Sequence, residues 1–435
     1  MYDAGLLEFS FVHELIWEYA QKITENPSYL NDLIQQLADS APKLMSTKAG
    51  AKVVCVLATY SGAKERKRLV KSLKGKVMES LLHPSAHLAI MRIVDVTDDT
   101  VNVQKSLLDE IRSIEPIVKY KANGEILEKP LPALVTISKH YFGRKLILRL
   151  LNPSRRHLEP DEELLFSAEV STSKKSADTR RTEHLVYLRH ALLSVCTTFA
   201  EDLVTCKNGC KVLEEVVWTF RPASVLNAII SLFTGDKSDH TYDCAEIENN
   251  IQNDSVEDEA SEEDFGDDAN ENFLSPDEEF SEYATTEKNE EIFEELYEEP
   301  SEDVDIPSTV EEESYVPIEE NPHAQAVLKS ILLLEAHSEN PSIELSRRTT
   351  VDKRLWEEGK HDVALNLVST LIKKSLVSQW LRHNRTCYAL LDSLKVPSAS
   401  AMIQEAITPY IEELKIYAKE HQGGRLLLER LDAMI

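Results

Sequence analysis

The chain has 435 residues, and its 76 Asp and Glu outnumber its 48 Lys and Arg, which gives a net charge of −28. Such a balance argues against a nucleic-acid-binding protein, because these domains usually carry net positive charge. The acid is unevenly spread, however: 34 carboxylates and only two lysines lie between Asp236 and Glu320, which leaves +4 on the rest of the chain. The 12 glycines are too few for Gly-rich phosphate loops or a turn-rich all-β fold.

The cysteines and the apolar runs indicate the environment of the protein. Six cysteines are scattered without the spacing of a disulfide framework, so we expect free thiols in a reducing compartment. No apolar run reaches the roughly eighteen residues of a membrane span. The N-terminus also lacks the basic flank and apolar stretch of a signal peptide. We therefore expect a soluble intracellular protein without membrane contact.

Apolar spacing along the chain is helical almost throughout. Near the N-terminus, Leu30, Leu33, Ile34 and Leu37 recur at three- and four-residue steps, and the segment 363–372 repeats the pattern. We find no alternating runs of β-branched residues bounded by hairpin turns. The sequence therefore predicts an all-α protein.

A short motif recurs within this helical pattern. It consists of a small residue, two variable positions, two apolar residues, one variable position and further apolar residues. Seven copies begin at Gly50, Ala86, Gly143, Gly209, Ala324, Thr386 and Gly423, and a weaker copy covers Val12–Trp17. The small residue is expected to let the turn between helices pass close to the preceding unit.

The spacing of the motif indicates a solenoid. Gly50 and Ala86 are 36 residues apart, and Thr386 and Gly423 are 37 apart. A period of this length is typical of helical repeats that bury their apolar faces only against their neighbours. Wider gaps contain polar insertions at residues 119–129 and 152–181. The acidic segment 238–320 is too charged to form a core, and we expect it to be a disordered insert.

No pattern of catalytic residues is present. The sequence has no Walker loop, no His-Glu-x-x-His motif and no nucleophile elbow. Cys206 and Cys210 are four residues apart, but no second Cys/His pair has ligand spacing, so a zinc site is not favoured. We predict neither an enzyme nor a metal or cofactor site.

Two groups of cations are candidates for contact with a nucleic-acid backbone. One is crowded onto a single predicted helix and comprises Lys64, Arg66, Lys67, Arg68 and Lys71. The other occupies the third motif position in four copies, as Lys52, Lys145, Lys211 and Arg425, with Arg144 beside it. Cations at equivalent positions of a solenoid would form a stripe along one face, which suits a phosphate backbone. An ordinary solvated helix face is the alternative, and the residues alone leave both open.

The motif resembles the second helix of Pumilio-homology (Puf) repeats, which present side chains to RNA bases. Three segments are similar to the Penguin-like, or Puf-A, nucleolar branch with its C-terminal Penguin-like (CPL) region: Ser138–Leu151, Asn321–Ala336 and Lys419–Leu431. This resemblance implies a right-handed α-solenoid of Puf/armadillo-like repeats. It divides the chain into Puf-type repeats at 1–104, the first part of the CPL region at 105–237, the acidic insert at 238–320, and the C-terminal part of the CPL region at 321–435.

The resemblance also implies a function. Members of this branch are nuclear and nucleolar, bind RNA or DNA with little sequence preference, and assist ribosomal RNA processing and large-subunit assembly. Translational regulation of mRNA is attributed to the family as well. Expected partners are therefore pre-rRNA, mRNA or DNA, and ribosome assembly factors or ribosomal proteins, bound by a monomer. Because the family carries more N-terminal repeats and a basic extension, the resemblance implies a partial gene product or a shortened homologue.

The base-reading positions of this chain do not match the Puf code. Pairs such as Ala51/Cys55 and Arg144/Leu148 lack the two hydrogen-bonding groups that a Watson–Crick edge requires. We therefore expect recognition of backbone and shape. A protein-interaction solenoid of the armadillo or HEAT kind is the alternative, and so is an acidic assembly chaperone without direct RNA contact.

Overall fold

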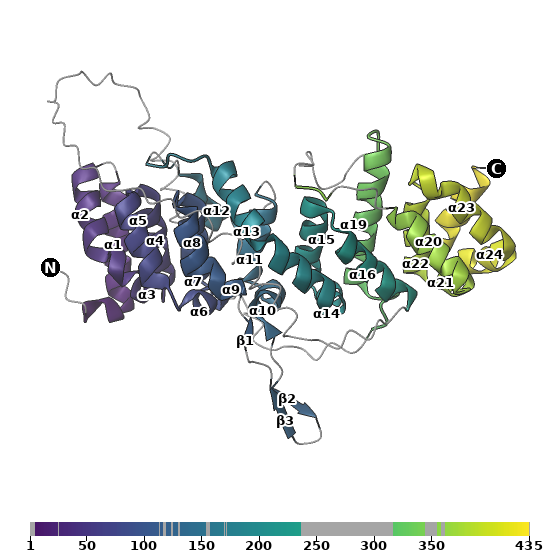
Figure 1. Cartoon of the computed structure of the whole chain (residues 1–435), viewed down its shortest axis with the longest axis horizontal. Helices are drawn as coiled ribbons and strands as arrows, with labels where there is room; N and C mark the ends of the chain where they lie inside the picture. Colours follow the sequence, from purple (N-terminus) through teal and green to yellow (C-terminus); the bar gives the residue numbers. More distant parts are fainter. Residues whose placement is uncertain are drawn as a thin grey trace, which may run out of the picture.

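The computed structural model describes residues 5–24, 26–112, 114–115, 119–122, 125–128, 131–153, 157–168, 170, 172–235, 316–343, 355–357 and 362–434. Figure 1 shows helices following one another along the long axis, with the two termini at opposite ends of the array. The predicted acidic insert lies almost wholly outside the described residues. The predicted all-α solenoid is confirmed.

The sequence motif marks one row of helices. In most units the motif coincides with the helix that packs against its counterpart in the next unit, as in the pairs α1–α4, α4–α7, α15–α19 and α22–α25. We call this row the motif row. Its members are α1 (Ser10–Ile23), α4 (Lys48–Tyr60), α7 (Ala86–Val96), α11 (Arg144–Leu151), α15 (Gly209–Phe220), α19 (Pro322–Glu339), α22 (Asn384–Ser393) and α25 (Gln422–Asp432).

Two further rows complete the solenoid. The second row runs beside the motif row through α2 (Pro27–Leu37), η2 (Ala38–Ser40), α5 (Ala63–Leu73), α8 (Thr100–Val103), η3 (Gln104–Leu108), α9 (Asp109–Arg112), α13 (Ala177–Thr198), α16 (Ala223–Thr234), α20 (Val363–Lys373) and α23 (Pro397–Ile407). Short helices form the third row: α3 (Ala41–Leu44), α6 (Val77–Leu82), α10 (Ala133–Lys139), α14 (Ala200–Thr205), α21 (Val377–Arg382) and α24 (Ile411–Glu420). The elements outside these rows are η1 (Leu6–Glu8), α12 (Pro160–Ser167) and η6 (Thr408–Tyr410).

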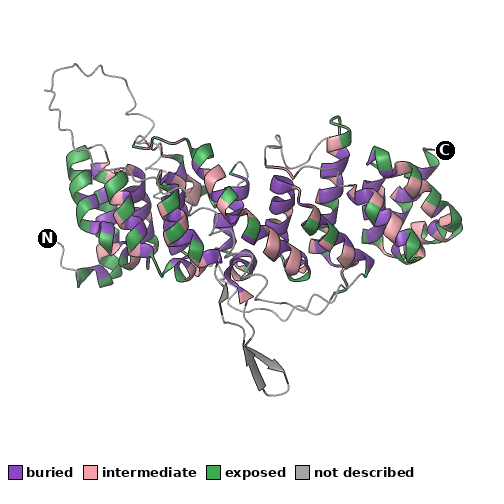
Figure 2. Ribbon diagram, viewed as in Figure 1, coloured by how far each residue is buried: buried purple, intermediate pink, exposed green. Residues whose placement is uncertain are grey.

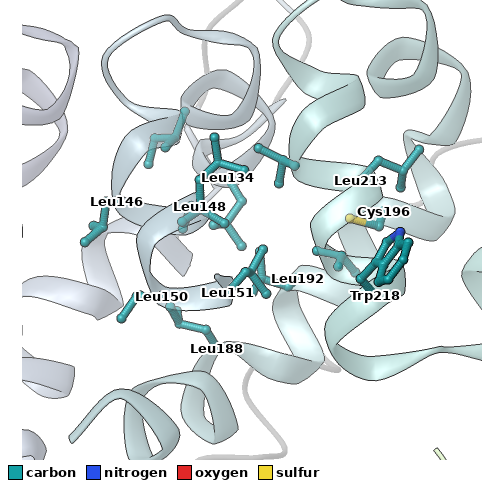
Figure 3. Packing of buried hydrophobic residues seen from close by; sticks show 14 of the residues in the cluster. Leu134, Leu146, Leu148, Leu150, Leu151, Leu188, Leu192, Cys196, Leu213 and Trp218 are labelled. Carbon is teal, nitrogen blue, oxygen red and sulfur yellow. The ribbon is translucent and has the colours of Figure 1, made fainter. Parts of the chain in front are cut away.

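The hydrophobic core is a continuous seam between the rows. Figure 2 shows buried residues along the whole array, on the helix faces that meet. At the joint of α11, α13 and α15, the side chains of Leu151, Leu192, Cys196 and Leu213 gather beside Trp218 (Figure 3). Each unit thus depends on its neighbours for burial, as expected for a repeat array. Among the described residues, no helix is long and apolar enough to cross a membrane.

Two small antiparallel strand pairs depart from the helical expectation. The segment predicted to be a polar insertion carries β2 (Lys119–Ala122) and β3 (Glu125–Glu128), paired with Ala122 opposite Glu125. At its base, β1 (Ile114–Glu115) pairs with β4 (Leu131–Pro132). The sequence between β2 and β3 is Asn-Gly, the strongest short hairpin signal, although neither strand contains an alternating run of β-branched residues.

The small residue at the head of the motif allows a close backbone approach. A Cβ added at Gly50 would lie 1.9 Å from the carbonyl oxygen of Leu44, and one at Gly423 would lie 2.3 Å from that of Asn384. Leu44 belongs to the short helix of the same unit, whereas Asn384 belongs to the preceding motif helix. The expected contact with the preceding unit therefore holds at Gly423, while Gly50 fits its own unit together.

Replacing Gly50 with Ala should lower the free energy of unfolding by about 1–3 kcal/mol, because the added methyl group must displace backbone. Gly62→Ala is the matched control, since a Cβ there meets only the flexible Glu65 carboxylate, at 3.0 Å. Urea denaturation followed by circular dichroism compares the two variants. Equal stability of both would contradict the close-approach explanation.

Candidate nucleic-acid interface

One face of α5 carries a row of exposed lysines. Lys64, Lys67 and Lys71 follow one another at steps of three and four residues, which places them on one side of the helix, and Lys74 follows directly after its last residue. All four are exposed, and none forms an ion pair or hydrogen bond with another described residue. We call these four residues the α5 lysine row. Between Ala63 and Lys76, seven cations stand against the single carboxylate of Glu65.

The opposite face of α5 holds the helix in place through Arg66. This side chain is 2% exposed, and it donates hydrogen bonds to the carbonyl oxygens of Ala58 and Thr59, each at 2.9 Å. A third bond, of 2.7 Å, reaches the hydroxyl of Thr172. Burial lowers the pKa of Arg66 to about 10, so it stays charged at neutral pH. Arg66 is therefore a structural residue, and its predicted contact with a phosphate is contradicted by its burial.

Arg68 has a partner as well. Its guanidinium contacts the Asp39 carboxylate at 2.6 Å on the neighbouring second-row helical turn η2. This hydrogen bond, helped by the charges of Arg68 and Lys71, holds the pKa of the Asp39 carboxyl below its usual value. The pair is exposed, and we expect it to contribute little to stability. Of the five cations predicted on this helix, Lys64, Lys67 and Lys71 form no ion pair or hydrogen bond with a described residue.

Three of the four cations of the third motif position lie near one another. Lys52, Lys145 and Lys211 all border one segment, residues 157–163, which includes the start of α12. Asp161 acts electrostatically on Lys52, Glu162 binds Lys145, and Lys211 lines a cavity of about 280 Å³ together with Glu159. The stripe therefore exists, but a stretch of the chain itself lies along it.

Lys145 is the most deeply enclosed member of the stripe. It is 2% exposed, and its Nζ donates to both carboxylate oxygens of Glu162, at 2.9 and 2.6 Å. Arg144 beside it is 8% exposed, donates a hydrogen bond to Asn208 and stacks on Tyr141. Neither side chain is free to meet a phosphate in this arrangement, so burial contradicts both as open contact sites. Their partners come from segments that the sequence pattern does not relate to them.

The remaining members of the stripe are more open. Lys52 is partly buried and lies 5.5 Å from the ring centre of Trp17, and burial together with the charge of Lys48 lowers its pKa. Arg425 is exposed on α25, at the far end of the array. Whether Lys52, Lys211 and Arg425 touch nucleic acid stays a prediction.

The positions that read bases in Puf repeats are closed in this chain. In the copies that begin at Gly50 and Ala86, these positions hold Ala51, Cys55, His87 and Met91, and all four are buried. Burial lowers the pKa of His87 to about 3, so its ring is neutral at pH 7. The closed positions support the prediction that this region reads no base sequence.

Known proteins match this chain over its CPL region and its repeats. The CPL (NUC119) domain family matches residues 139–255. Pumilio homology domain family member 6 of Saccharomyces cerevisiae is 26% identical over 257 residues, which span 55% of this chain and 36% of the yeast protein. The chain thus aligns with about a third of that relative's length.

Solved structures of human Puf-A share the fold. The crystal structure of human Puf-A gives a TM-score of 0.65 at 19% identity, covering 98% of this chain and 63% of that chain. The crystal structure of human Puf-A in complex with DNA gives a TM-score of 0.62 at 20% identity, covering 98% of this chain and 62% of the other.

The fold and the motif row define this protein as a helical solenoid of the Puf type. The CPL match and the Pumilio-homology relative make the chain similar to Puf-A/Penguin-like proteins, and the resemblance stated from the sequence is confirmed. The boundaries predicted at residues 104, 237 and 320 stay predictions.

Arg66 and Lys67 are neighbours on α5, but their replacement is expected to affect stability to very different extents. Arg66→Ala should lower the free energy of unfolding by about 2–3 kcal/mol, because it leaves two buried carbonyl oxygens without their donor. Lys67→Ala should change it by less than about 0.5 kcal/mol, because the side chain is exposed. Urea denaturation measures both. An Arg66→Ala variant as stable as the unmodified protein would contradict the structural role assigned to Arg66.

Proposed function

We propose that this protein is a non-catalytic scaffold that binds RNA through its phosphate backbone, with little preference for sequence, and that DNA is a second ligand. The observation that carries the proposal is the α5 lysine row, whose four side chains are exposed and form no ion pair or hydrogen bond with a described residue. Free cations of this kind release condensed counterions when they meet a polyanion, which drives binding without reading bases.

Two further features support this proposal. Lys105 on η3, which packs beside α5, is exposed and extends the positive surface beyond the row. The closed base-reading positions of α4 and α7 leave no ring or amide that could select a base there. Human Puf-A has been crystallised in complex with DNA, which is consistent with a ligand recognised through its backbone.

We also propose the cellular role that the Puf-A/Penguin-like resemblance implies. The protein would act in the nucleus and nucleolus, on pre-rRNA, in rRNA processing and assembly of the large ribosomal subunit, next to assembly factors or ribosomal proteins. Regulation of mRNA translation is a further role of the same binding surface. Microscopy of a tagged protein, with sedimentation of pre-ribosomal particles, tests this placement independently of the binding assay.

The binding proposal is tested by replacing the whole α5 lysine row with Gln. The variant Lys64→Gln/Lys67→Gln/Lys71→Gln/Lys74→Gln should bind unrelated single-stranded RNAs of equal length more weakly, and all by the same factor. The slope of log affinity against log salt should fall by about three, at roughly 0.7 for each phosphate that the variant no longer neutralises. Fluorescence anisotropy across a salt series measures both quantities.

A matched control removes the same charge elsewhere. Lys22, Lys207, Lys373 and Lys419 are exposed on other elements, and their combined replacement by Gln should leave most of the affinity and slope intact. Equal weakening in both variants would mean that only net charge matters. Unchanged binding in both, together with protein capture that resists RNase, would favour the armadillo-like interaction solenoid.

A further inference from the structure

Helix α12 lies across the motif row in the N-terminal half of the solenoid. It contacts α4, and its side chains reach cations on α4 and α11. Its sequence, PDEELLFS, has three consecutive acidic residues after the proline and an aromatic residue, Phe166, next to its last position. The acidic end contacts the lysines Lys48 and Lys145 of the motif row. The aromatic end contacts two arginines of the same row, on α7 and α11.

The acidic end of α12 pairs with Lys48 on α4 and with Lys145, a member of the cation stripe, on α11. Asp161 lies 3.2 Å from the Nζ of Lys48, and Glu162 grips Lys145 with both oxygens. Glu162 also accepts the backbone N–H of Glu159 at 3.0 Å, which closes the first turn of the helix as a capping box. The carboxylates therefore occupy positions along the stripe where the phosphates of a bound strand would sit.

The aromatic end of α12 lies between two guanidinium groups. The ring of Phe166 is 4.3 Å from the guanidinium carbon of Arg149 and 5.6 Å from that of Arg92. Arg92 also donates to the carbonyl oxygens of Phe166 and Ala168, at 3.3 and 2.8 Å. A cavity of about 340 Å³, lined in part by Arg92, Arg149 and Phe166, opens beside the ring.

The guanidinium group of Arg149 retains hydrogen-bonding capacity that α12 does not use. It contacts Asp95 and Glu163 at 3.5 and 3.9 Å, which is long for charge-assisted hydrogen bonds, and its Nε has no hydrogen-bond partner among the described residues. A guanidinium stacked on a ring and facing a cavity can accept a base on its plane and a phosphate on its edge. The groove beneath α12 thus combines cations for phosphate with a stacking platform for a base.

We propose that α12 occupies, in cis, a groove on the motif row that binds single-stranded nucleic acid, so that the helix and the strand compete for the same cations. This inference rests on the proposed function and deepens it, because it assigns a second, masked surface in addition to the α5 lysine row. The masked groove is formed by Lys48, Lys52, Lys145, Arg92 and Arg149.

The attachment of α12 is of a kind that a polyanion can replace. The helix has eight residues, too few to be stable on its own, and only Leu165 and Phe166 within it are buried, each at 8% exposure. The remaining contacts are largely ion pairs, for which phosphates are direct substitutes. An incoming strand would also satisfy Lys145, which would otherwise stay buried without a counter-ion.

Neutralising the acidic end of α12 tests the competition. The variant Asp161→Asn/Glu162→Gln/Glu163→Gln should bind a 20-nucleotide single-stranded RNA at least tenfold more tightly than the unmodified protein. Its slope of log affinity against log salt should be steeper by about three. The four cations beside these carboxylates, Lys48, Lys52, Lys145 and Arg149, become available at roughly 0.7 each. The control Glu201→Gln/Glu405→Gln/Glu420→Gln removes equal charge from exposed sites on other helices and should change the affinity by less than threefold.

A second variant keeps the buried pair. Asp161→Asn/Glu163→Gln leaves Glu162 on Lys145 and should give an intermediate gain in affinity, even if the triple variant proves too unstable to purify. Hydrogen–deuterium exchange of the unmodified protein adds an independent measurement. The amides of residues 161–167 should exchange faster when the RNA is added, since the strand releases α12.

The outcomes separate the two proposals. If both α12 variants bind like the control and the RNA does not speed exchange in 161–167, α12 is a fixed part of the fold and the competition is refuted. The α5 variant decides the proposed function separately, because it leaves α12 and its partners intact. If the α5 variant loses binding and the α12 variants show no gain, the α5 lysine row is the binding surface and the masked groove is not.

Discussion

The pairing of α12 with the motif row determines which cations of this solenoid are available. Lys145 sits at 2% exposure because Glu162 meets it with both oxygens, and Lys48 lies beside Asp161. Without Glu162, Lys145 would be a buried charge without a counter-ion, which is costly. The accessible positive surface is therefore displaced to α5, on the second row.

The sequence predicted the fold because the repeat motif reports directly on packing. A small residue followed by paired apolar residues recurs wherever a motif helix enters the seam, and Gly50 and Gly423 show the close approach behind it. The alignment of Lys52, Lys145 and Lys211 on one side was predictable for the same reason, since equivalent positions in a solenoid stack. The strand pair at β2 and β3 was also predictable, from the Asn-Gly pair that separates the two strands.

The burial of individual cations was not predictable from the motif. Arg66 is held partly by Thr172, 106 residues further along the chain, and Lys145 by Glu162, which lies in an insertion outside the repeat pattern. A repeat describes contacts between units, whereas insertions find their partners through the folded shape. The run Asp161-Glu162-Glu163 after Pro160 did mark the start of an acidic helix, but nothing in its spacing indicates which cations it would meet.

Arg66 also has a consequence for the geometry of any ligand on the other side of its helix. Arg66 binds two carbonyl oxygens at the end of α4 and the hydroxyl of Thr172, and these bonds hold α5 in place. The lysines therefore keep their separation before a strand binds, and little conformational entropy is lost on binding. From Lys64 to Leu73, its last residue, the helix rises about 13.5 Å, at 1.5 Å per residue. One strand of a duplex presents roughly four phosphates over that length, at about 3.4 Å each. In the proposed binding mode, α5 would hold its lysines at a fixed spacing that matches a few successive phosphates.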